Sequence, residues 1–347
     1  MVEDKINNEL MEILKMVSPG TPLRTAIDDI SKSGTGALIV FGNSPEMMRL
    51  VNGGFEVNCK FTPQRLIELC KMDGAVVVDS DVKKILYANT LLVPDPSIPT
   101  TETGTRHKAA ERAAKQLSQL VIAISEKKKT INLYYGDIKY ALRGAQELLD
   151  RAGDTLRMLE KHKEIFNEFI LNINVLEFTG LISLQDVIIA VQRSEMIDRI
   201  SSIIKRYIIE LGVEGGLVKM QLKELVKDVG EEELSIIKDY SKKDSISTKN
   251  SLLELSIEEL IETDKIMKAM GFQSNDELIT TKGHRILGRT SLTNDEIGEI
   301  IKKFENFQSI FECSEEELEQ VMSKEKAKKL KKEISKLKEQ VMLGKKI

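Results

Sequence analysis

The stretch Gly34-Thr35-Gly36-Ala37-Leu38-Ile39-Val40-Phe41 carries five consecutive apolar side chains directly after a glycine-rich turn. An uninterrupted apolar run of this length is typical of a strand that is buried on both faces. Two similar runs follow along the chain, Ala75-Val76-Val77-Val78 and Val121-Ile122-Ala123-Ile124. Helical segments separate these runs, so the sequence predicts an α/β domain in which helices cover both faces of a mixed sheet.

The other elements of this domain, which we assign to residues 1–140, follow from the spacing of apolar residues. Intervals of three and four predict helices, and short apolar runs or strict alternation predict strands. Helices are expected at residues 6–17, 23–33, 63–69 and 105–117, and further strands at residues 55–61, 85–93 and 131–135.

The remainder of the chain is predicted to be all-α. Residues 141–240 contain no proline, and their apolar residues recur at helical spacing, which is typical of a helical spine. Residues 239–251 are rich in serine and lysine and are expected to form a linker. Residues 252–347 break into short helices joined by tight turns, so we expect a third domain built of helical hairpins.

Composition narrows the class of protein. The 347 residues carry a net charge of −4, so any nucleic-acid surface must be local. One candidate is residues 321–347, where ten lysines stand against three glutamates; a solvated helix face and contact with nucleic acid explain this charge equally well. Three cysteines without CxxC spacing exclude a disulfide scaffold and a zinc site. No apolar segment is long enough to span a membrane, so we expect a cytoplasmic protein.

The first candidate motif is Asp73-Gly74-Ala75, which lies where a helix ends and a buried strand begins. An aspartate at such an edge can hold a divalent metal ion or accept a proton from a hydroxyl group. The glycine allows a ligand to approach the backbone closely. A plain Asp-Gly turn is the commoner explanation of the same residues.

The second candidate motif is Thr101-Glu102-Thr103-Gly104-Thr105-Arg106-His107-Lys108, directly before a predicted helix. Thr103 or Thr105 is expected to cap that helix. The helix dipole repels cations at this end, so three basic residues in the first turn indicate a bound anion, for which a phosphate chain is the natural candidate. Arg106 paired with a nearby carboxylate remains the alternative.

Other motifs predict no chemistry. Gly34-Thr35-Gly36 precedes a strand instead of following one, so it is not a dinucleotide-binding fingerprint, and no Walker A pattern occurs. His162 and His284 have no apparent partners and are expected to be surface residues.

The two candidate motifs together resemble those of the diadenylate cyclase family, whose signatures are Asp-Gly-Ala and Arg-His-Arg. Here they stand as Asp73-Gly74-Ala75 and Arg106-His107-Lys108. The segments Asn174-Val175-Leu176-Glu177-Phe178 and Gln192-Arg193-Ser194-Glu195-Met196 are similar to the spine of one member of that family. The end of the chain is similar to that member's helix-hairpin-helix DNA-binding domain, so the resemblance covers nearly the whole chain.

This resemblance implies a nucleotidyltransferase that condenses two ATP molecules into cyclic di-AMP and releases two pyrophosphates. Each 3′-hydroxyl attacks the α-phosphate of the opposing ATP, so two cyclase domains must face each other. The family implies a homo-octamer assembled by the spine, with Mg²⁺ or Mn²⁺ as cofactor. It also implies branched or damaged DNA as a partner, association with the nucleoid, and roles in DNA-damage checkpoint sensing and DNA repair.

The resemblance also assigns roles to single residues. Asp73 is expected to coordinate the metal or activate the 3′-hydroxyl, with Arg106 and His107 completing the catalytic set. The ATP-binding residues that it implies are Gly74, Leu92, Thr105, Arg106, His107, Lys108, Ala109 and Ser125. The DNA-binding residues that it implies are Ser323, Lys324, Lys328 and Lys331.

Several positions depart from the family pattern. Lys108 and Ala109 stand where the family usually has arginine and threonine, and Glu126 stands where it often has arginine, with Lys127 to Lys129 next. The hairpin Val321-Met322-Ser323-Lys324 lacks the usual Gly-x-Gly. These departures leave an alternative open, which is a DNA-binding oligomeric scaffold with weak or no cyclase turnover.

Overall fold

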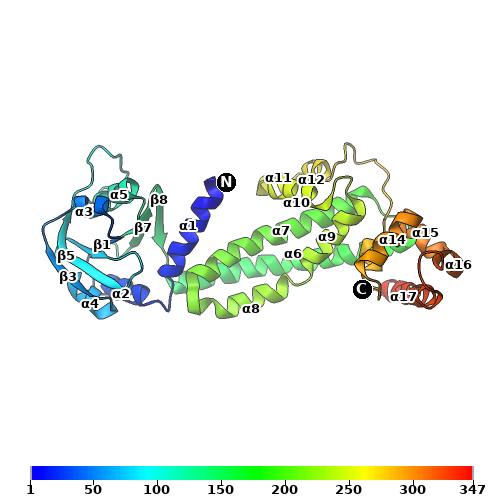
Figure 1. Ribbon diagram of the computed structural model, residues 1–347, viewed down its shortest axis with the longest axis horizontal. Helices are drawn as coiled ribbons and strands as arrows, with labels where there is room; N and C mark the ends of the chain where they lie inside the picture. The colour runs from blue at the N-terminus through cyan, green and yellow to red at the C-terminus, as the bar shows by residue number, and fades with distance from the viewer. Residues whose placement is uncertain (1, 346–347) are drawn as a thin grey trace. The chain divides into compact units, whose positions relative to one another are not determined.

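The computed structural model describes the backbone of residues 2–345 and the side chains of residues 9–345. It divides into two compact units (Figure 1). The first unit comprises Met1–Gly153 and Lys205–Lys219, and the second comprises Asp154–Ile204 and Met220–Ile347. The boundaries fall inside three helices: α6 (Ala145–Thr179), α7 (Leu184–Leu211) and α8 (Gly216–Leu225).

The first unit is built on a mixed sheet of eight strands. β1 (Ala37–Phe41) lies at its centre and pairs in parallel with β4 (Ala75–Val78) and antiparallel with β6 (Val121–Ile124). The strand order is β2-β5-β4-β1-β6-β7-β8, and β3 pairs with β5. The remaining strands are β2 (Val51–Asn52), β3 (Phe55–Lys60), β5 (Lys84–Leu92), β7 (Ile131–Tyr135) and β8 (Ile138–Leu142).

Helices cover both faces of this sheet, as the sequence predicts. α2 (Pro22–Lys32) and α4 (Pro63–Leu69) lie on one side, and α3 (Pro45–Leu50) and α5 (Thr105–Leu117) lie on the other (Figure 1). Side chains alternate along β1. Ile39 packs in the cluster that holds α1 (Val2–Met16), α2 and α4, whereas Leu38 and Val40 pack in the cluster that holds α3 and α5. Each such fully buried aliphatic side chain contributes roughly 1.5–3 kcal/mol.

Our sequence expectations lack several elements of the first unit, among them β8, α3 and the two-residue strand β2. β8 extends the sheet past residue 140 after a turn at Gly136, and its Ile138, Tyr140 and Leu142 alternate with polar or small residues. α3 begins after Ser44, whose side chain accepts a hydrogen bond from the Met47 amide. The Ser-Pro pair that starts α3 is a recognisable helix-start signal.

Every regular element among the described residues of the second unit is a helix, which confirms the predicted helical region. In it α9 (Val229–Tyr240) and several shorter helices accompany the long helices, and Phe178 of α6 packs in one core with Ile300, Phe307 and Leu330. The remaining helices of the second unit are α10 (Ser245–Leu253), α11 (Ile257–Ile261), α12 (Thr263–Ala269), α13 (His284–Leu287), α14 (Asn294–Phe304), α15 (Phe307–Glu312), α16 (Glu315–Leu318) and α17 (Lys324–Met342). The short 3-10 helix η1 (Gly212–Gly215) belongs to the first unit.

The segment expected to be a linker is ordered helix instead. Residues 239–251 end α9 and form most of α10, which the Asp244 side chain caps by accepting hydrogen bonds from the Ile246 and Ser247 amides. Thr248 and Leu252, four residues apart, are both buried. The prediction was wrong because polar residues of this stretch take part in the packing: Ser241 is buried, and Lys249 pairs with the buried Glu195 and Glu233.

A buried ionic cluster joins α13 to α6 and α9. The Arg285 guanidinium donates hydrogen bonds to Glu177 of α6 and, at 2.6 Å, to Glu232 of α9. The Asp239 carboxylate accepts from the backbone amides of Gly283 and Arg285, at 2.8 and 2.9 Å. His284 was expected to be an unpartnered surface residue, but its Nδ1 lies 3.0 Å from Asp239 Oδ1. The basic Lys-Gly-His-Arg stretch is therefore part of the helix packing.

No helix among the described residues is long and apolar enough to cross a membrane.

Candidate active site

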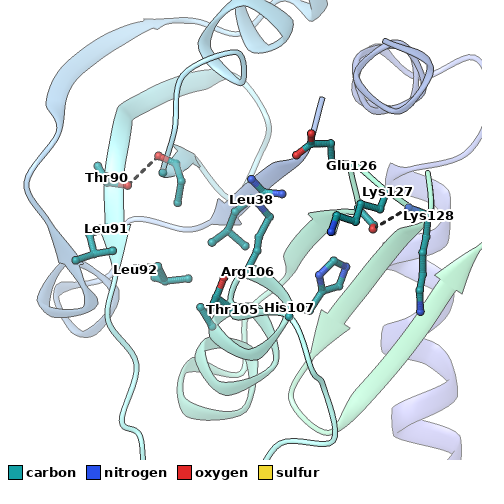
Figure 2. Close-up of a pocket in the computed structure, with 15 residues that line it drawn as sticks. Leu38, Thr90, Leu91, Leu92, Thr105, Arg106, His107, Glu126, Lys127 and Lys128 are labelled. Carbon is teal, nitrogen blue, oxygen red and sulfur yellow. Dashed lines mark hydrogen bonds between the residues drawn. The ribbon is translucent and has the colours of Figure 1, made fainter. Parts of the chain in front are cut away.

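A cavity of about 620 Å³ opens at one edge of the sheet in the first unit (Figure 2). Its walls come from β1, from the start of β4, from the end of β5, from the start of α5 and from the loop after β6. The lining residues are Leu38, Gly74, Ala75, Thr90, Leu91, Leu92, Gly104, Thr105, Arg106, His107, Ala109, Ser125, Glu126, Lys127 and Lys128.

The cavity lies on the face of the sheet that α5 covers. Leu38 and Ala75 line the cavity and also pack in the core cluster that holds Ala110 and Ala113 of α5. Ala37 pairs with Ile124 in the antiparallel ladder, and Ile39 pairs with Val76 in the parallel one. The start of β1, the start of β4 and the end of β6 therefore meet at the same edge.

Gly74 permits a close approach of backbones at this edge. Its φ is +89°, and a Cβ atom built there would lie 2.6 Å from the Thr90 carbonyl oxygen of the adjacent strand, so no other residue fits without moving that strand. The Thr90 hydroxyl donates a 2.9 Å hydrogen bond to the Ala75 carbonyl oxygen and holds the two strands together. Asp73, just before the glycine, is exposed and is not among the residues that line the cavity.

α5 presents its amino end to the cavity without a side-chain cap. Its N-cap residue is Gly104, and no side chain makes a capping hydrogen bond, so the expected cap by Thr103 or Thr105 is wrong. Thr105, Arg106, His107 and Ala109 line the cavity, whereas Lys108 does not. The first amides of the helix are thus left for a ligand, and anions are favoured at such an end.

His107 stands against a polar group that the sequence did not reveal. Its ring meets the Tyr134 ring edge-on at 6.5 Å, and the Tyr134 hydroxyl donates a 2.7 Å hydrogen bond to Glu102. Glu102 in turn pairs with Lys139 at 2.5 Å. Burial lowers the pKa of His107 below the ordinary histidine value, and the nearby Arg106, Lys139 and Lys128 lower it further against the opposing effect of Glu102. These surroundings therefore favour the neutral imidazole.

The loop between β6 and β7 contributes Ser125, Glu126, Lys127 and Lys128 to the wall. The Lys128 amide donates to the Ser125 hydroxyl at 3.2 Å and fixes the turn. Both lysines line the same cavity as Arg106. Arg106 extends from α5 past Leu38 (Figure 2), and within the described part of the chain its side chain has neither a hydrogen bond nor an ion pair. The alternative of an Arg106–carboxylate pair is thus not what the structure contains.

The cavity therefore combines an apolar wall with positive charge that has no ion-pair partner among the described residues. Leu38, Ala75 and Leu92 form the apolar side. Arg106, Lys127 and Lys128 outnumber the single acid Glu126. Among the described residues, no group of three or more histidine, cysteine, aspartate or glutamate side chains could hold a metal ion. Such a cavity can accept an apolar ring system at one end and a multiply charged anion at the other.

Comparison with known families identifies the relatives of this chain. Residues 24–138 match the nucleotide-binding region of the DisA bacterial checkpoint controller, and residues 142–279 match its linker region. Proteins named DNA integrity scanning protein DisA from Clostridium botulinum (strain Loch Maree / Type A3) and Clostridium tetani (strain Massachusetts / E88) are each 42% identical to it. Each alignment covers 98% of this chain, and 98% and 97% of the two relatives. The chain belongs to the DisA family.

Membership of the DisA family confirms the resemblance seen in the two motifs and in the spine. The cavity lies within the nucleotide-binding region of that family, since all its lining residues fall between positions 38 and 128. Among solved structures, DacA from Staphylococcus aureus matches 40% of this chain and 90% of its own with 22% identity and a TM-score of 0.30, a similarity too low to add to the sequence evidence.

The four residues expected to bind DNA lie at the start of α17. Ser323 is the N-cap residue of α17 but makes no capping hydrogen bond, and Lys324 and Lys328 are exposed. Lys331 differs from them, because its ammonium donates to the backbone carbonyls of Ile310 at 3.3 Å and Phe311 at 2.8 Å. It holds α17 against α15 and is thus engaged within the protein.

Proposed function

We propose that this protein is a diadenylate cyclase, which condenses two ATP molecules into cyclic di-AMP and two pyrophosphates. One observation carries the proposal. A single cavity holds Gly74 of the first motif, Arg106 and His107 of the second, and Ser125, although these residues are up to 51 positions apart in the sequence. Its apolar wall suits an adenine ring, and its uncapped helix end and free cations suit a triphosphate.

The proposed reaction is a displacement at phosphorus that occurs twice. A 3′-hydroxyl oxygen forms a bond to the α-phosphorus of the opposing ATP, and the bond from that phosphorus to the bridging oxygen of pyrophosphate breaks. The hydroxyl proton passes to the Asp73 carboxylate, which is exposed next to Gly74 at the cavity edge. Positive charge from Arg106 and from the two lysines of the β6–β7 loop stabilises the charge that develops on the phosphate oxygens.

Asp73 suits a role in binding Mg²⁺ or Mn²⁺. Magnesium in phosphoryl-transfer sites is commonly held by one or two carboxylates together with substrate phosphates and water, so a dedicated cluster of protein ligands is not required. A single exposed carboxylate beside a triphosphate site meets that pattern. When bound, the metal would offset phosphate charge and polarise the reacting phosphate.

Lys127 and Lys128 offset the positions at which this chain departs from the family motif. Glu126 brings a negative charge to the cavity where the family often has arginine. Two lysines of the same loop also line the cavity, so the net charge of the loop there is positive. This favours an active cyclase over the alternative of a scaffold with weak or no turnover. Ala109, which also lines the cavity, supplies no hydroxyl, so one contact of the family pattern is lost.

We propose further that the active form is an oligomer and that the second unit binds DNA. Each cavity holds one ATP, so a cyclic product requires two cavities that face each other, and the family resemblance suggests a homo-octamer. Leu91, which lines the cavity at the end of β5, and Val93, just beyond the strand, are exposed apolar residues and suit such a contact. For DNA, the exposed Lys324 and Lys328 suit sequence-independent contact with phosphates.

The substitution Asp73→Asn tests the proposed role of the Asp73 carboxylate in accepting the hydroxyl proton. The variant is expected to bind ATP and keep the oligomeric state of the wild type, but to form cyclic di-AMP at least about 100-fold more slowly, as befits loss of a general base. Product formed at the wild-type rate would remove Asp73 from the mechanism. Dissociation of the oligomer would instead make Asp73 a structural residue.

A further inference from the structure

We infer that Gly36 is a positioning residue for Arg106: the side chain that Gly36 lacks leaves the space in which the Arg106 guanidinium lies. This inference rests on the proposed function, because it concerns how the cavity holds its nucleotide. Gly36 belongs to the Gly34-Thr35-Gly36 turn, which is not part of either candidate motif.

The contact is direct. A Cβ atom built on Gly36 would lie 2.8 Å from Cζ of Arg106 and 3.1 Å from Nη2, with Nη1 closer still. Three guanidinium atoms at such distances mean that the planar group of Arg106 covers the Gly36 Cα. Real Cβ atoms do not approach neighbours this closely, so any side chain at position 36 must displace the guanidinium.

The position of Gly36 in the sheet explains why this contact matters for the cavity. Gly36 directly precedes β1, and side-chain alternation places it on the same face as Leu38, which lines the cavity. Continuing the β1–β6 register by one residue sets Gly36 opposite Ser125. The Arg106 guanidinium thus lies over the start of β1, at the edge of the sheet where the cavity opens.

The backbone at position 36 does not itself require glycine. Its φ lies outside the left-handed region, unlike that of Gly34 in the same turn, which is +72°. Gly34 also has nothing within 4 Å of an added Cβ. Glycine is therefore needed at the two positions of the turn for different reasons: Gly34 allows the turn, and Gly36 makes room for Arg106.

Packing alone holds the Arg106 head in this place. Within the described residues its side chain has neither an ion pair nor a hydrogen bond. An added methyl group at position 36 would therefore move the guanidinium by side-chain rotation and break no interaction that stabilises the fold. The five N–H donors of Arg106 would then point elsewhere, and bidentate binding of a phosphate needs them in a fixed orientation.

The variant Gly36→Ala tests this inference on the full-length protein. The probe is ATP with the α,β-bridging oxygen replaced by CH₂, which binds but cannot react. We expect binding to weaken roughly tenfold, the cost of one disturbed charge-assisted contact, at an unchanged melting temperature. Gly144→Ala is the matched control in the same unit, since Gly144 has no positive φ and nothing within 4 Å of an added Cβ. It should bind the probe as the wild type does.

A double-mutant cycle separates positioning from a merely structural role. In an Arg106→Ala background the space over Gly36 is empty, so adding Gly36→Ala should weaken binding no further. The inference would be overturned if Gly36→Ala bound the probe as tightly as the wild type does. It would also be overturned if the losses of affinity in the two single variants added in the double variant. Failure of the wild-type protein to bind the probe at all would instead contradict the proposed function.

Discussion

Single residues set the charge of the cavity, and His107 is the one whose charge can change near neutral pH. Its half-buried ring is held against Tyr134 and surrounded by Arg106, Lys128 and Lys139, which together with burial lower its pKa. A bound triphosphate would add negative charge beside the ring and raise that pKa again. Nucleotide binding is therefore expected to take up a proton at His107.

This coupling predicts a pH dependence of binding. For a group whose pKa rises on binding, affinity increases as pH falls through the bound-state value towards the free one. The affinity ratio of wild type to His107→Gln should accordingly grow between about pH 8 and about pH 6, a range that spans the ordinary histidine value. Taking the ratio cancels the titration of ATP itself. A ratio that stays flat or falls would show that His107 does not gain a proton with the nucleotide.

At the scale of single residues, the sequence predicted which segments form the cavity but not the direction in which each side chain points. Gly74, Leu92, Thr105, Arg106, His107, Ala109 and Ser125 all line the cavity, whereas Asp73 and Lys108 do not. Consecutive residues of a helix diverge by about 100°, and Lys108 lies on a part of α5 that does not border the cavity, although Arg106 and His107 before it do. The contact between Tyr134 and Glu102 was not predicted, because a hydrogen bond between residues 32 positions apart leaves no local pattern.

Among the elements, the short helix α13 depends on the ionic cluster beneath it. Arg285 is buried and forms ion pairs with both Glu177 and Glu232, which are buried as well. Removing one partner of a buried pair leaves an uncompensated charge and typically costs about 3–5 kcal/mol.

Arg285→Ala should therefore lower the free energy of unfolding of the second unit by about 3–5 kcal/mol, followed by circular dichroism in urea. Arg289→Ala is the matched control. It also removes a partner of Glu232, but Arg289 is exposed and Glu232 keeps Arg285, so the loss should stay near about 1 kcal/mol or below. Equal losses in the two variants would show that burial of Arg285 contributes nothing extra.

Element prediction worked where periodicity was long and unbroken. The apolar run of β1 and the range of α5 are found as predicted, because a buried strand and an amphipathic helix each leave a regular pattern. Composition misled at residues 239–251, since a Ser/Lys-rich stretch is typical of linkers although Thr248 and Leu252 are buried. β8 was missed because the strand is short and only its alternation marks it.

For the molecule as a whole, the proposed cyclase activity and the proposed DNA binding are assigned to different units of the chain. Lys328 and Lys332 are exposed and four residues apart on α17, so they share one helix face. Reversing both to glutamate should weaken DNA binding roughly tenfold and flatten its salt dependence, because each lysine that binds a phosphate releases counterions. Basal cyclic di-AMP synthesis should not change.

The control for this variant is Lys219→Glu with Lys223→Glu on α8, two exposed lysines at the same spacing and with the same change in charge. DNA binding measured by fluorescence anisotropy should fall only in the α17 variant. An equal loss in both would mean that net charge, and no particular surface, sets the affinity. DNA binding unaffected in the α17 variant would remove this helix face from the proposal.

The most direct test of the whole account is the product that the wild-type protein makes from ATP. Purified protein is incubated with ATP and Mg²⁺ or Mn²⁺, and the products are identified by mass. The cyclase proposal predicts cyclic di-AMP and pyrophosphate, two pyrophosphates for each cyclic dinucleotide. No cyclic di-AMP with either metal, from protein that binds ATP and remains oligomeric, would contradict it and leave a DNA-binding scaffold as the better description.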